Sequence, residues 1–182
     1  MVVVPGNAMT QPRQIIPGKT VLITRRTLRR YFLLRPDRKT NDIFKYLIAV
    51  MANKFGMVCH ALCVMSSHSH IVLTDTRGEL PNSLCELDRL LAFSMKVHRK
   101  WEGLLRDHES TSAVHLQTPE SIIEKIAYLI ANPTEVGAVY HAKDWPGLNT
   151  TISDLGKAKW EAKRPDVYFD QTNEEWPDTA RV

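Results

Sequence analysis

Two histidines separated by one residue, His68 and His70, are the first candidates for chemistry in this chain. They begin a run of β-branched and apolar residues that predicts a strand. Side chains two positions apart in a strand lie on one face, about 6.6 Å apart along the backbone, so both imidazoles can bind one divalent ion while Ser69 points away. Two ordinary polar residues beside a turn are the alternative interpretation, because this spacing also occurs without a metal.

A tyrosine and an asparagine on a predicted helix form the second candidate group. Thr118 as a cap and Pro119 in the first turn indicate where this helix begins, and Pro133 disfavours helical angles in the residue before it, so we expect the end near Asn132. Tyr128 lies about half a turn from the centre of the apolar stripe, and Asn132 follows four residues later on the same face. Both can face one polar site; a solvent-facing tyrosine and a helix-terminal asparagine would give the same pattern. The stripe consists of Ile122, Ile123, Ile126, Ala127, Leu129 and Ile130.

The positive charge of the chain is concentrated near its beginning. Residues 1–39 contain nine lysines and arginines and one acidic residue, whereas the formal net charge of the whole chain is only +4. A basic block of this kind favours a polyanionic partner, and a solvated basic strand and turn is the alternative. Tyr31 and Phe32 lie among these arginines, and such interleaving of rings and bases suits single-stranded nucleic acid.

Two segments carry a family resemblance. Residues 65–73 read Met-Ser-Ser-His-Ser-His-Ile-Val-Leu, and residues 126–139 read Ile-Ala-Tyr-Leu-Ile-Ala-Asn-Pro-Thr-Glu-Val-Gly-Ala-Val. Together they resemble the single-strand DNA transposases that have a His-hydrophobic-His motif and one catalytic tyrosine, and among these the REP-associated tyrosine transposases. The resemblance extends over residues 17–150, and the Arg25-Arg26 and Trp145-Pro146 pairs fit the same layout.

The resemblance implies a role for each matching residue. Tyr128 matches the nucleophile, His68 and His70 match the metal-binding histidines, and Asn132 matches the polar residue that completes a site for Mg²⁺ or Mn²⁺. The implied reaction nicks and rejoins single-stranded DNA with a hairpin through a 5′-phosphotyrosine intermediate. The residues expected to contact DNA are basic: Arg25, Arg26, Arg29, Arg30, Arg35, Lys39 and Lys125.

Three departures from the family pattern keep other functions open. Ser69 replaces the usual hydrophobe, Glu135 stands where a basic residue is common, and residues 145–147 read Trp-Pro-Gly in place of Trp-Ser-Ser. The departures at Ser69 and Glu135 favour, as an alternative, a catalytically silent module that binds single-stranded nucleic acid. A metal-dependent hydrolase of small phosphoesters is a third hypothesis, although it would need no basic block.

The expected elements form an α+β fold. The order strand, helix, strand, strand, helix, strand, helix is typical of a ferredoxin-like or palm-like sandwich, and the resemblance implies an antiparallel sheet of about five strands. We expect a helix over residues 41–54 capped by Asn41 or Asp42, and a central strand over residues 57–65. The other expected strands are residues 19–27, 68–75 and 114–117, and the remaining helices are residues 81–100 and 118–132.

Length and composition indicate one domain. The chain has 182 residues, of which 43% are apolar, and we divide it into a mobile tail over residues 1–14, a transposase-like domain over 15–150 and a polar extension over 151–182. Its apolar runs are far shorter than the roughly 20 residues that span a bilayer, and no signal peptide is evident. We therefore expect a soluble cytoplasmic protein with free thiols, either a monomer or a homodimer.

Overall fold

The fold is built on an antiparallel sheet with helices on both faces. The computed structural model describes residues 15–106, 111–156 and 160–181, so the tail expected over residues 1–14 lies outside the described residues. In chain order the elements are β1 (Lys19–Arg26), the short 3₁₀ helix η1 (Leu28–Arg30), α1 (Arg38–Phe55), β2 (Met57–Val64), β3 (His68–Asp75), α2 (Leu80–Arg99), β4 (Thr111–Leu116), α3 (Pro119–Glu135), the 3₁₀ helices η2 (Ala142–Asp144) and η3 (Ile152–Asp154), β5 (Glu161–Lys163) and β6 (Thr179–Arg181).

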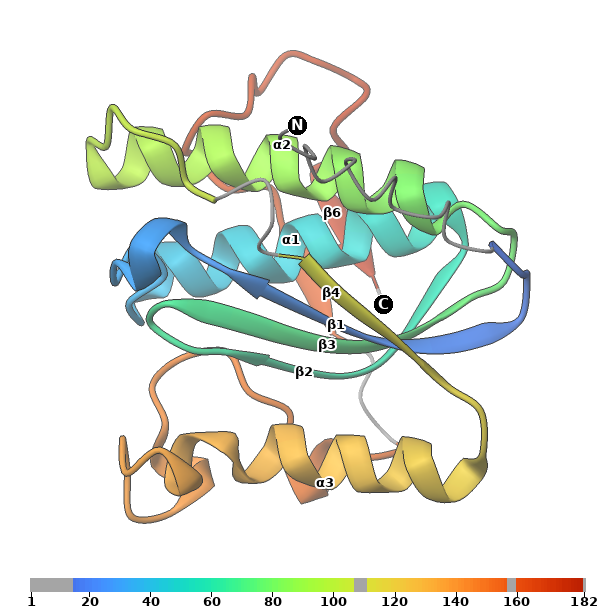
Figure 1. Ribbon diagram of the computed structural model, residues 1–182. Helices are drawn as coiled ribbons and strands as arrows, with labels where there is room; N and C mark the ends of the chain where they lie inside the picture. The colour runs from blue at the N-terminus through green and yellow to red at the C-terminus, as the bar shows by residue number, and fades with distance from the viewer. Residues whose placement is uncertain (1–14, 107–110, 157–159, 182) are drawn as a thin grey trace, which may run out of the picture.

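The main sheet has the strand order β2-β3-β1-β4, which together with the β-α-β-β-α-β order of elements is the ferredoxin-like arrangement. Figure 1 shows α1 and α2 on one face of the sheet and α3 on the other. The α+β sandwich expected from the sequence is therefore confirmed. The main sheet contains four strands in the described residues, one fewer than the resemblance implied, and β5 and β6 form a separate two-stranded sheet.

The prediction that residues 57–65 form a central strand is wrong, because β2 lies at the edge of the sheet. Its continuous apolar sequence has another cause. Helices cover both faces, and the segment 148–150 covers the outer edge, where Val64 N–H donates to Leu148 O and Thr150 N–H donates to Leu62 O, each at 2.8 Å. An edge strand that is covered on three sides is as apolar as a central one.

Helix α1 begins four residues earlier than its capping signal suggested. The cap is Asp37, whose carboxylate accepts a 2.8 Å hydrogen bond from Thr40 N–H, so the prediction of Asn41 or Asp42 as the cap is wrong. Pro36 followed by the capping acid Asp37 forms the entry to the helix. Gly56 ends the helix, with the left-handed φ of 69° that favours glycine.

The charged Asp37 carboxylate stabilises the start of helix α1, and replacing it tests this role. Burial raises the pKa of Asp37, but hydrogen bonds from Thr40 N–H, His98 and Arg99 outweigh burial and hold the pKa well below its usual range. We expect Asp37→Ala to lower the free energy of unfolding at pH 7 by about 1–2 kcal/mol, the scale of a lost cap. Urea denaturation measures this change.

Asp37→Asn is the matched control, because it keeps a capping oxygen and removes the charge. The folded pKa is depressed, so the charge stabilises the protein above the ordinary pKa of about 4, and this stabilisation is lost as the pH falls further. The stability difference between the native protein and Asp37→Asn should therefore be constant above pH 5 and smaller at pH 3. A difference that does not change between pH 7 and pH 3 contradicts the assignment.

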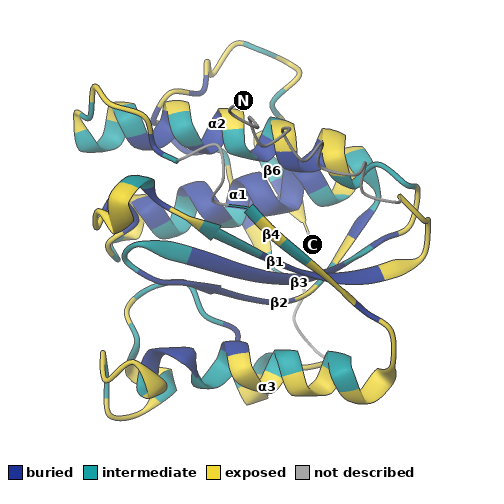
Figure 2. Ribbon diagram, in the orientation of Figure 1, coloured by how far each residue is buried: buried dark blue, intermediate teal, exposed yellow. Residues whose placement is uncertain are grey.

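Helix α3 differs from its predicted form in length and in its buried face. It continues through Pro133 to Glu135 rather than ending near Asn132, and both Asn132 and Pro133 are buried. Ile123 is 68% exposed and Ala127 is also exposed, so the stripe that packs on the sheet is narrower than predicted and is centred on Leu129. The helix covers the sheet face with one side only, and the remaining apolar residues face solvent (Figure 2).

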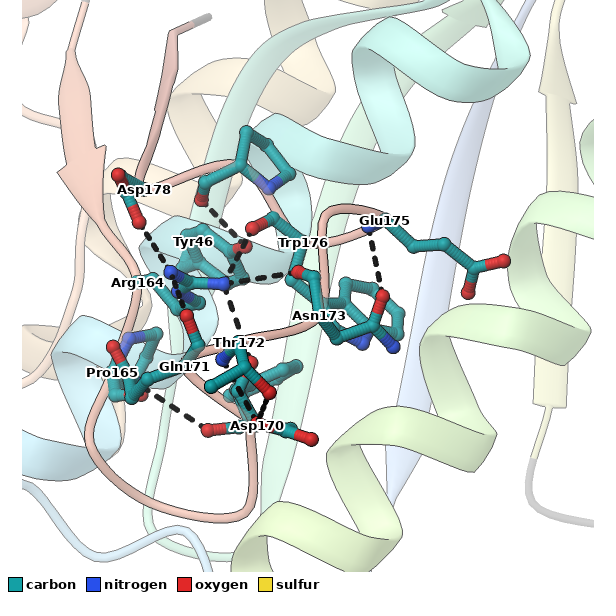
Figure 3. A network of polar contacts seen from close by, with 12 residues as sticks. Tyr46, Arg164, Pro165, Asp170, Gln171, Thr172, Asn173, Glu175, Trp176 and Asp178 are labelled. Atoms are coloured by element: carbon teal, nitrogen blue, oxygen red, sulfur yellow. Dashed lines mark hydrogen bonds and ion pairs between the residues drawn. The ribbon is translucent and has the colours of Figure 1, made fainter.

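The C-terminal segment completes the core on the side of α1. Strands β5 and β6 pack against α1, and Val167 and Phe169 are buried with them. Figure 3 shows how this segment is held together: the Arg164 guanidinium donates to the carbonyl oxygens of residues 170, 171, 173 and 176 and pairs with Asp178. Tyr46 of α1 donates to Pro177 O at 2.9 Å and so fixes the segment to the helix.

Two smaller expectations concern cysteines and membranes. The three cysteines are free, with Cys63 buried, Cys59 half-buried and Cys85 exposed. Among the described helices, none combines the length and apolar character needed to cross a bilayer.

Candidate active site

The sheet face under α3 brings together the four residues that the sequence singled out. In the pairing of β1 with β3, Arg26 lies opposite His68 and Thr24 lies opposite His70. The ring centroids of His68 and His70 are 4.9 Å apart, and those of His70 and Tyr128 are 5.6 Å apart. A strand and a helix that are distant in sequence therefore place two imidazoles and a phenol in direct contact.

Hydrogen bonds orient both imidazoles. The Thr24 hydroxyl and His70 Nδ1 share a bond of 2.9 Å, and the Ser67 hydroxyl and His68 Nδ1 share one of 3.3 Å. With both Nδ1 atoms engaged, the Nε2 atoms are the ones suited to bind a metal. A hydroxyl that holds the far nitrogen of a metal-binding histidine fixes its tautomer and ring orientation.

Both histidines are neutral at neutral pH. Burial, together with the charges of His68 and Arg26, lowers the pKa of His70 to about 4. Burial also lowers the pKa of His68; the Asn132 amide beside it opposes this shift, and the charges of Arg26 and Arg30 add to it. Only a neutral imidazole can donate its lone pair to a metal, so this environment prepares the pair for one.

Asn132 links the histidines to the tyrosine. It is 3% exposed, its Nδ2 donates to the Tyr128 hydroxyl oxygen at 3.2 Å, and its buried Oδ1 has no hydrogen-bond partner within the part of the chain that the structure describes. An unpaired buried acceptor is costly, and a cation would satisfy it. Two neutral imidazoles and one amide oxygen are a donor set that fits Mn²⁺ and tolerates Mg²⁺.

The phenol of Tyr128 is accessible. The residue is 38% exposed, so a substrate can reach it from solvent. The hydrogen bond that Asn132 donates to its oxygen holds the ring beside the histidines. On the same flank of α3, Lys125 is half-buried and pairs with Glu124 at 2.7 Å.

The two neighbouring arginines of β1 lie on opposite faces of the sheet. Arg26 is exposed on the face of the histidines, directly opposite His68. Arg25 points to the other face, where it pairs with Asp88 of α2, and Arg106 pairs with the same carboxylate at 3.3 Å. The structure thus brings Arg26 to the site and gives Arg25, also expected to bind DNA, a partner within the fold.

This division predicts different effects for two similar substitutions. Arg26→Ala should weaken single-stranded DNA binding and reduce the slope of log affinity against log salt by about one. Arg25→Ala should leave that slope unchanged and lower the free energy of unfolding by about 2 kcal/mol, less than a fully buried ion pair because both partners are partly exposed. Fluorescence anisotropy over a salt series and urea denaturation separate the two. Equal salt slopes for both variants would contradict the assignment.

The other basic residues lie at different distances from the site. Arg29 and Arg30 are exposed on η1, and Arg30 is close enough to lower the pKa of His68. Arg35 is exposed just before α1, and Lys39 is exposed in the first turn of α1, on the opposite side of the sheet from α3 (Figure 1). The structure therefore groups Arg26 and Arg30 with His68, His70 and Tyr128, and separates Lys39 from them.

The structural roles of two residues at this site were not predicted from the sequence. Thr24 orients His70, and its signal is its place two positions before Arg26 on the same face of β1. Trp145 donates from its indole N–H to Val64 O at 2.9 Å and ties the segment after α3 to the sheet. Both roles depend on pairing between distant segments.

Comparisons with known proteins support the fold. No family model matches the chain, and no curated protein matches it. A solved structure of a REP-associated tyrosine transposase bound to a REP hairpin matches with a TM-score of 0.64 and 19% identity, over 80% of this chain and 84% of that one. A Deinococcus radiodurans protein assigned as a transposase matches with a TM-score of 0.45 and 22% identity, over 68% of this chain and 97% of that one. The chain has the fold of a REP-associated tyrosine transposase.

Proposed function

We propose that this protein is a metal-dependent enzyme that nicks and rejoins single-stranded DNA, with Tyr128 as its nucleophile. The observation that carries the proposal is the cluster formed by the Tyr128 phenol, the His70 ring that it contacts, the neighbouring His68 ring and the Asn132 amide, whose buried oxygen has no hydrogen-bond partner in the described residues. The shared fold supports it, because the matching transposase was solved with a REP hairpin bound.

The proposed step is an attack of the phenol on a phosphodiester. A bond forms between the Tyr128 oxygen and phosphorus, and the bond from phosphorus to the 3′ oxygen breaks. The phenolic proton leaves, and the departing 3′ oxygen takes up a proton. The resulting 5′-phosphotyrosine keeps the energy of the phosphodiester, so the 3′ hydroxyl of a second strand can reverse the step without a nucleotide cofactor.

His68, His70 and Asn132 are the residues that would hold a divalent ion, Mg²⁺ or Mn²⁺. Such an ion, when bound, draws charge from the scissile phosphate and orients it. The protein itself supplies the neutral imidazoles, the hydroxyls that orient them and the Asn132 N–H that donates to the Tyr128 oxygen.

The expected substrate is single-stranded DNA beside a hairpin, held partly by Arg26 and Arg30. Both arginines lie next to His68, where their charge can meet phosphates close to the reacting one. All the proposed site residues come from one chain, so a monomer can carry a complete site, and a homodimer is not required for the chemistry.

An adduct assay tests the proposal. Hairpin oligonucleotides with randomised single-stranded flanks are labelled at either the 5′ or the 3′ end and incubated with Mn²⁺, Mg²⁺ or EDTA. A 5′-phosphotyrosine carries the 3′-labelled fragment into the protein band and releases the 5′-labelled fragment. Mass spectrometry after nuclease digestion should place the modification on Tyr128.

Each part of the proposal can fail separately in this assay. An adduct that carries the 5′ label would contradict the proposed 5′-phosphotyrosine linkage. An adduct that forms equally well in EDTA would contradict the proposed metal dependence. Salt-sensitive binding without any adduct would indicate the catalytically silent binding module instead.

A further inference from the structure

The loop after β1 exposes two aromatic rings beside the candidate active site. This η1 loop, residues 27–35, exposes 43% of Tyr31 and 66% of Phe32 between exposed arginines and the buried Leu33 and Leu34. We propose that the η1 loop is a stacking platform for unpaired bases of the DNA strand that enters the active site. The inference rests on the proposed function for the identity of the substrate, single-stranded DNA.

The η1 loop is joined directly to the turn before His68. Thr27 N–H donates to Ser67 O at 2.8 Å, and Leu34 N–H donates to Ser66 O at 2.9 Å. Both ends of the loop are therefore bonded to the two residues that precede the first histidine. A strand whose phosphate lies at His68 would pass over this loop within a nucleotide or so.

Hydrogen bonds and a ring contact hold the η1 loop in place on the side that faces the protein. The buried Thr27 hydroxyl donates to Tyr31 O at 2.6 Å, and Arg99 donates to Leu33 O at 3.2 Å. Trp101 packs edge-on against Tyr31 with ring centroids 5.6 Å apart. The Tyr31 ring, which this contact fixes before binding, loses little conformational freedom when a base stacks on it, so this arrangement favours affinity.

Two arginines of the loop adopt a backbone conformation that favours glycine. Arg29 has a φ of 48° and Arg30 a φ of 57°, both in the left-handed region. Side-chain-bearing residues rarely adopt it, and such strain clusters at binding and catalytic sites. Glycine would relieve the strain here, but the guanidinium groups would be lost.

The charge of the loop fits a nucleic acid strand. Residues 26–35 contain four arginines, Arg26, Arg29, Arg30 and Arg35, and no acidic residue. Rings and cations on one loop match the bases and phosphates of a strand, because every base has a face that can stack and every linkage carries a charge. An apolar protein partner would not require this concentration of positive charge.

Phe93 provides a matched comparison on another part of the surface. It is 45% exposed on α2 and stacks on Tyr168 with centroids 5.5 Å apart and planes 6° from parallel. A ring face that is already stacked is less available to a base. Phe93→Leu therefore removes an exposed ring of the same kind without removing a platform for DNA.

The test compares DNA with and without bases. Binding is measured by fluorescence anisotropy, in EDTA and with Tyr128→Phe in every protein, so that neither metal nor cleavage contributes. The probes are an oligothymidylate of roughly 12 nucleotides and an abasic oligomer of the same length, which keeps the phosphates. The added variants are Phe32→Leu, Phe32→Trp and the control Phe93→Leu.

We expect Phe32→Leu to weaken binding of the oligothymidylate by about 5- to 100-fold, the scale of one base–ring stack. Binding of the abasic oligomer should change by less than about twofold, Phe32→Trp should restore affinity, and Phe93→Leu should have no effect. An equal loss on both probes, or no loss on either, overturns the proposal.

The outcome is separable from that of the proposed function. Because the binding assay contains neither metal nor the Tyr128 hydroxyl, the platform stands if the expected pattern appears even when no covalent adduct forms. An adduct that forms while Phe32→Leu binds oligothymidylate normally rejects the platform and leaves the proposed function intact.

Discussion

Replacing Tyr128 with phenylalanine is expected to lower the rate of covalent adduct formation by roughly 10⁴- to 10⁶-fold, the scale on which a catalytic nucleophile contributes. The substitution removes one oxygen and keeps the ring that contacts His70. Because the residue is 38% exposed, the fold should tolerate the change. The measurement is the single-turnover rate of adduct formation in Mn²⁺, together with the affinity for uncleaved DNA, which should remain close to that of the native protein.

Tyr140→Phe is the matched control for this prediction. Tyr140 follows the same helix, is 90% exposed, and has its ring contact with His141 rather than with the histidine pair. It should form adduct at the native rate. If Tyr128→Phe still forms adduct at a comparable rate, the nucleophile is another residue, and loss of adduct in both variants would implicate the segment rather than the Tyr128 hydroxyl.

Removing His70 should have the second largest effect. We expect His70→Ala to weaken Mn²⁺ binding and to slow adduct formation by roughly 10³-fold, because a catalytic metal contributes several kcal/mol to a reaction of this kind. Calorimetry measures the first effect and the adduct assay the second. His60→Ala is the control, since His60 is exposed on β2 and hydrogen-bonds to Thr74 at 2.7 Å. If His70→Ala binds Mn²⁺ as tightly as the native protein, the assignment of His70 as a metal ligand is wrong.

The low pKa of His70 also makes the stability of the folded protein depend on pH. A pKa of about 4 keeps His70 neutral in the folded protein at pH 5.5, where an ordinary histidine is mostly protonated. In EDTA, the unfolded chain takes up a proton below about pH 6.5 and the folded protein does not, so stability should fall as the pH drops from about 6.5 toward 4. His70→Ala should reduce this slope, and urea denaturation at several pH values measures it.

Local sequence patterns predicted most of the elements around the site. Runs of β-branched and apolar residues located β1 and β3. The Thr118 cap was confirmed, with its hydroxyl accepting from Ser121 N–H at 3.2 Å. These features depend on residues close together in the chain, which is why the sequence is sufficient for them.

Features that depend on distant segments could not be predicted. The bond between Thr24 and His70 requires the register of β1 against β3, and the roles of Arg25 and Arg26 require knowing which face α2 covers. The exposed Ile123 shows the same limit, since a helix pattern does not reveal how wide a surface its partner offers. When both faces of a strand are covered, the sequence does not show which of two adjacent side chains faces the site and which faces the core.

The C-terminal segment was the least predictable part of the fold. Strands β5 and β6 have three residues each, too few for a recognisable alternation. The segment is held by one arginine that bonds to several backbone carbonyls, as Figure 3 shows. A side chain that binds backbone groups leaves no periodic signal, because any residue can supply a carbonyl.

The alternation of β1 gives a rule for re-engineering the protein. Its odd-numbered positions, such as Val21 and Arg25, belong to the layer of α1 and α2, and its even-numbered positions, such as Leu22 and Arg26, belong to the layer of α3. New substrate preferences should therefore be sought at even positions and greater thermal tolerance at odd ones. A deletion of one residue within the strand would move the residues on one side of it to the opposite face, so that one change would disturb both the proposed DNA contact of Arg26 and the core.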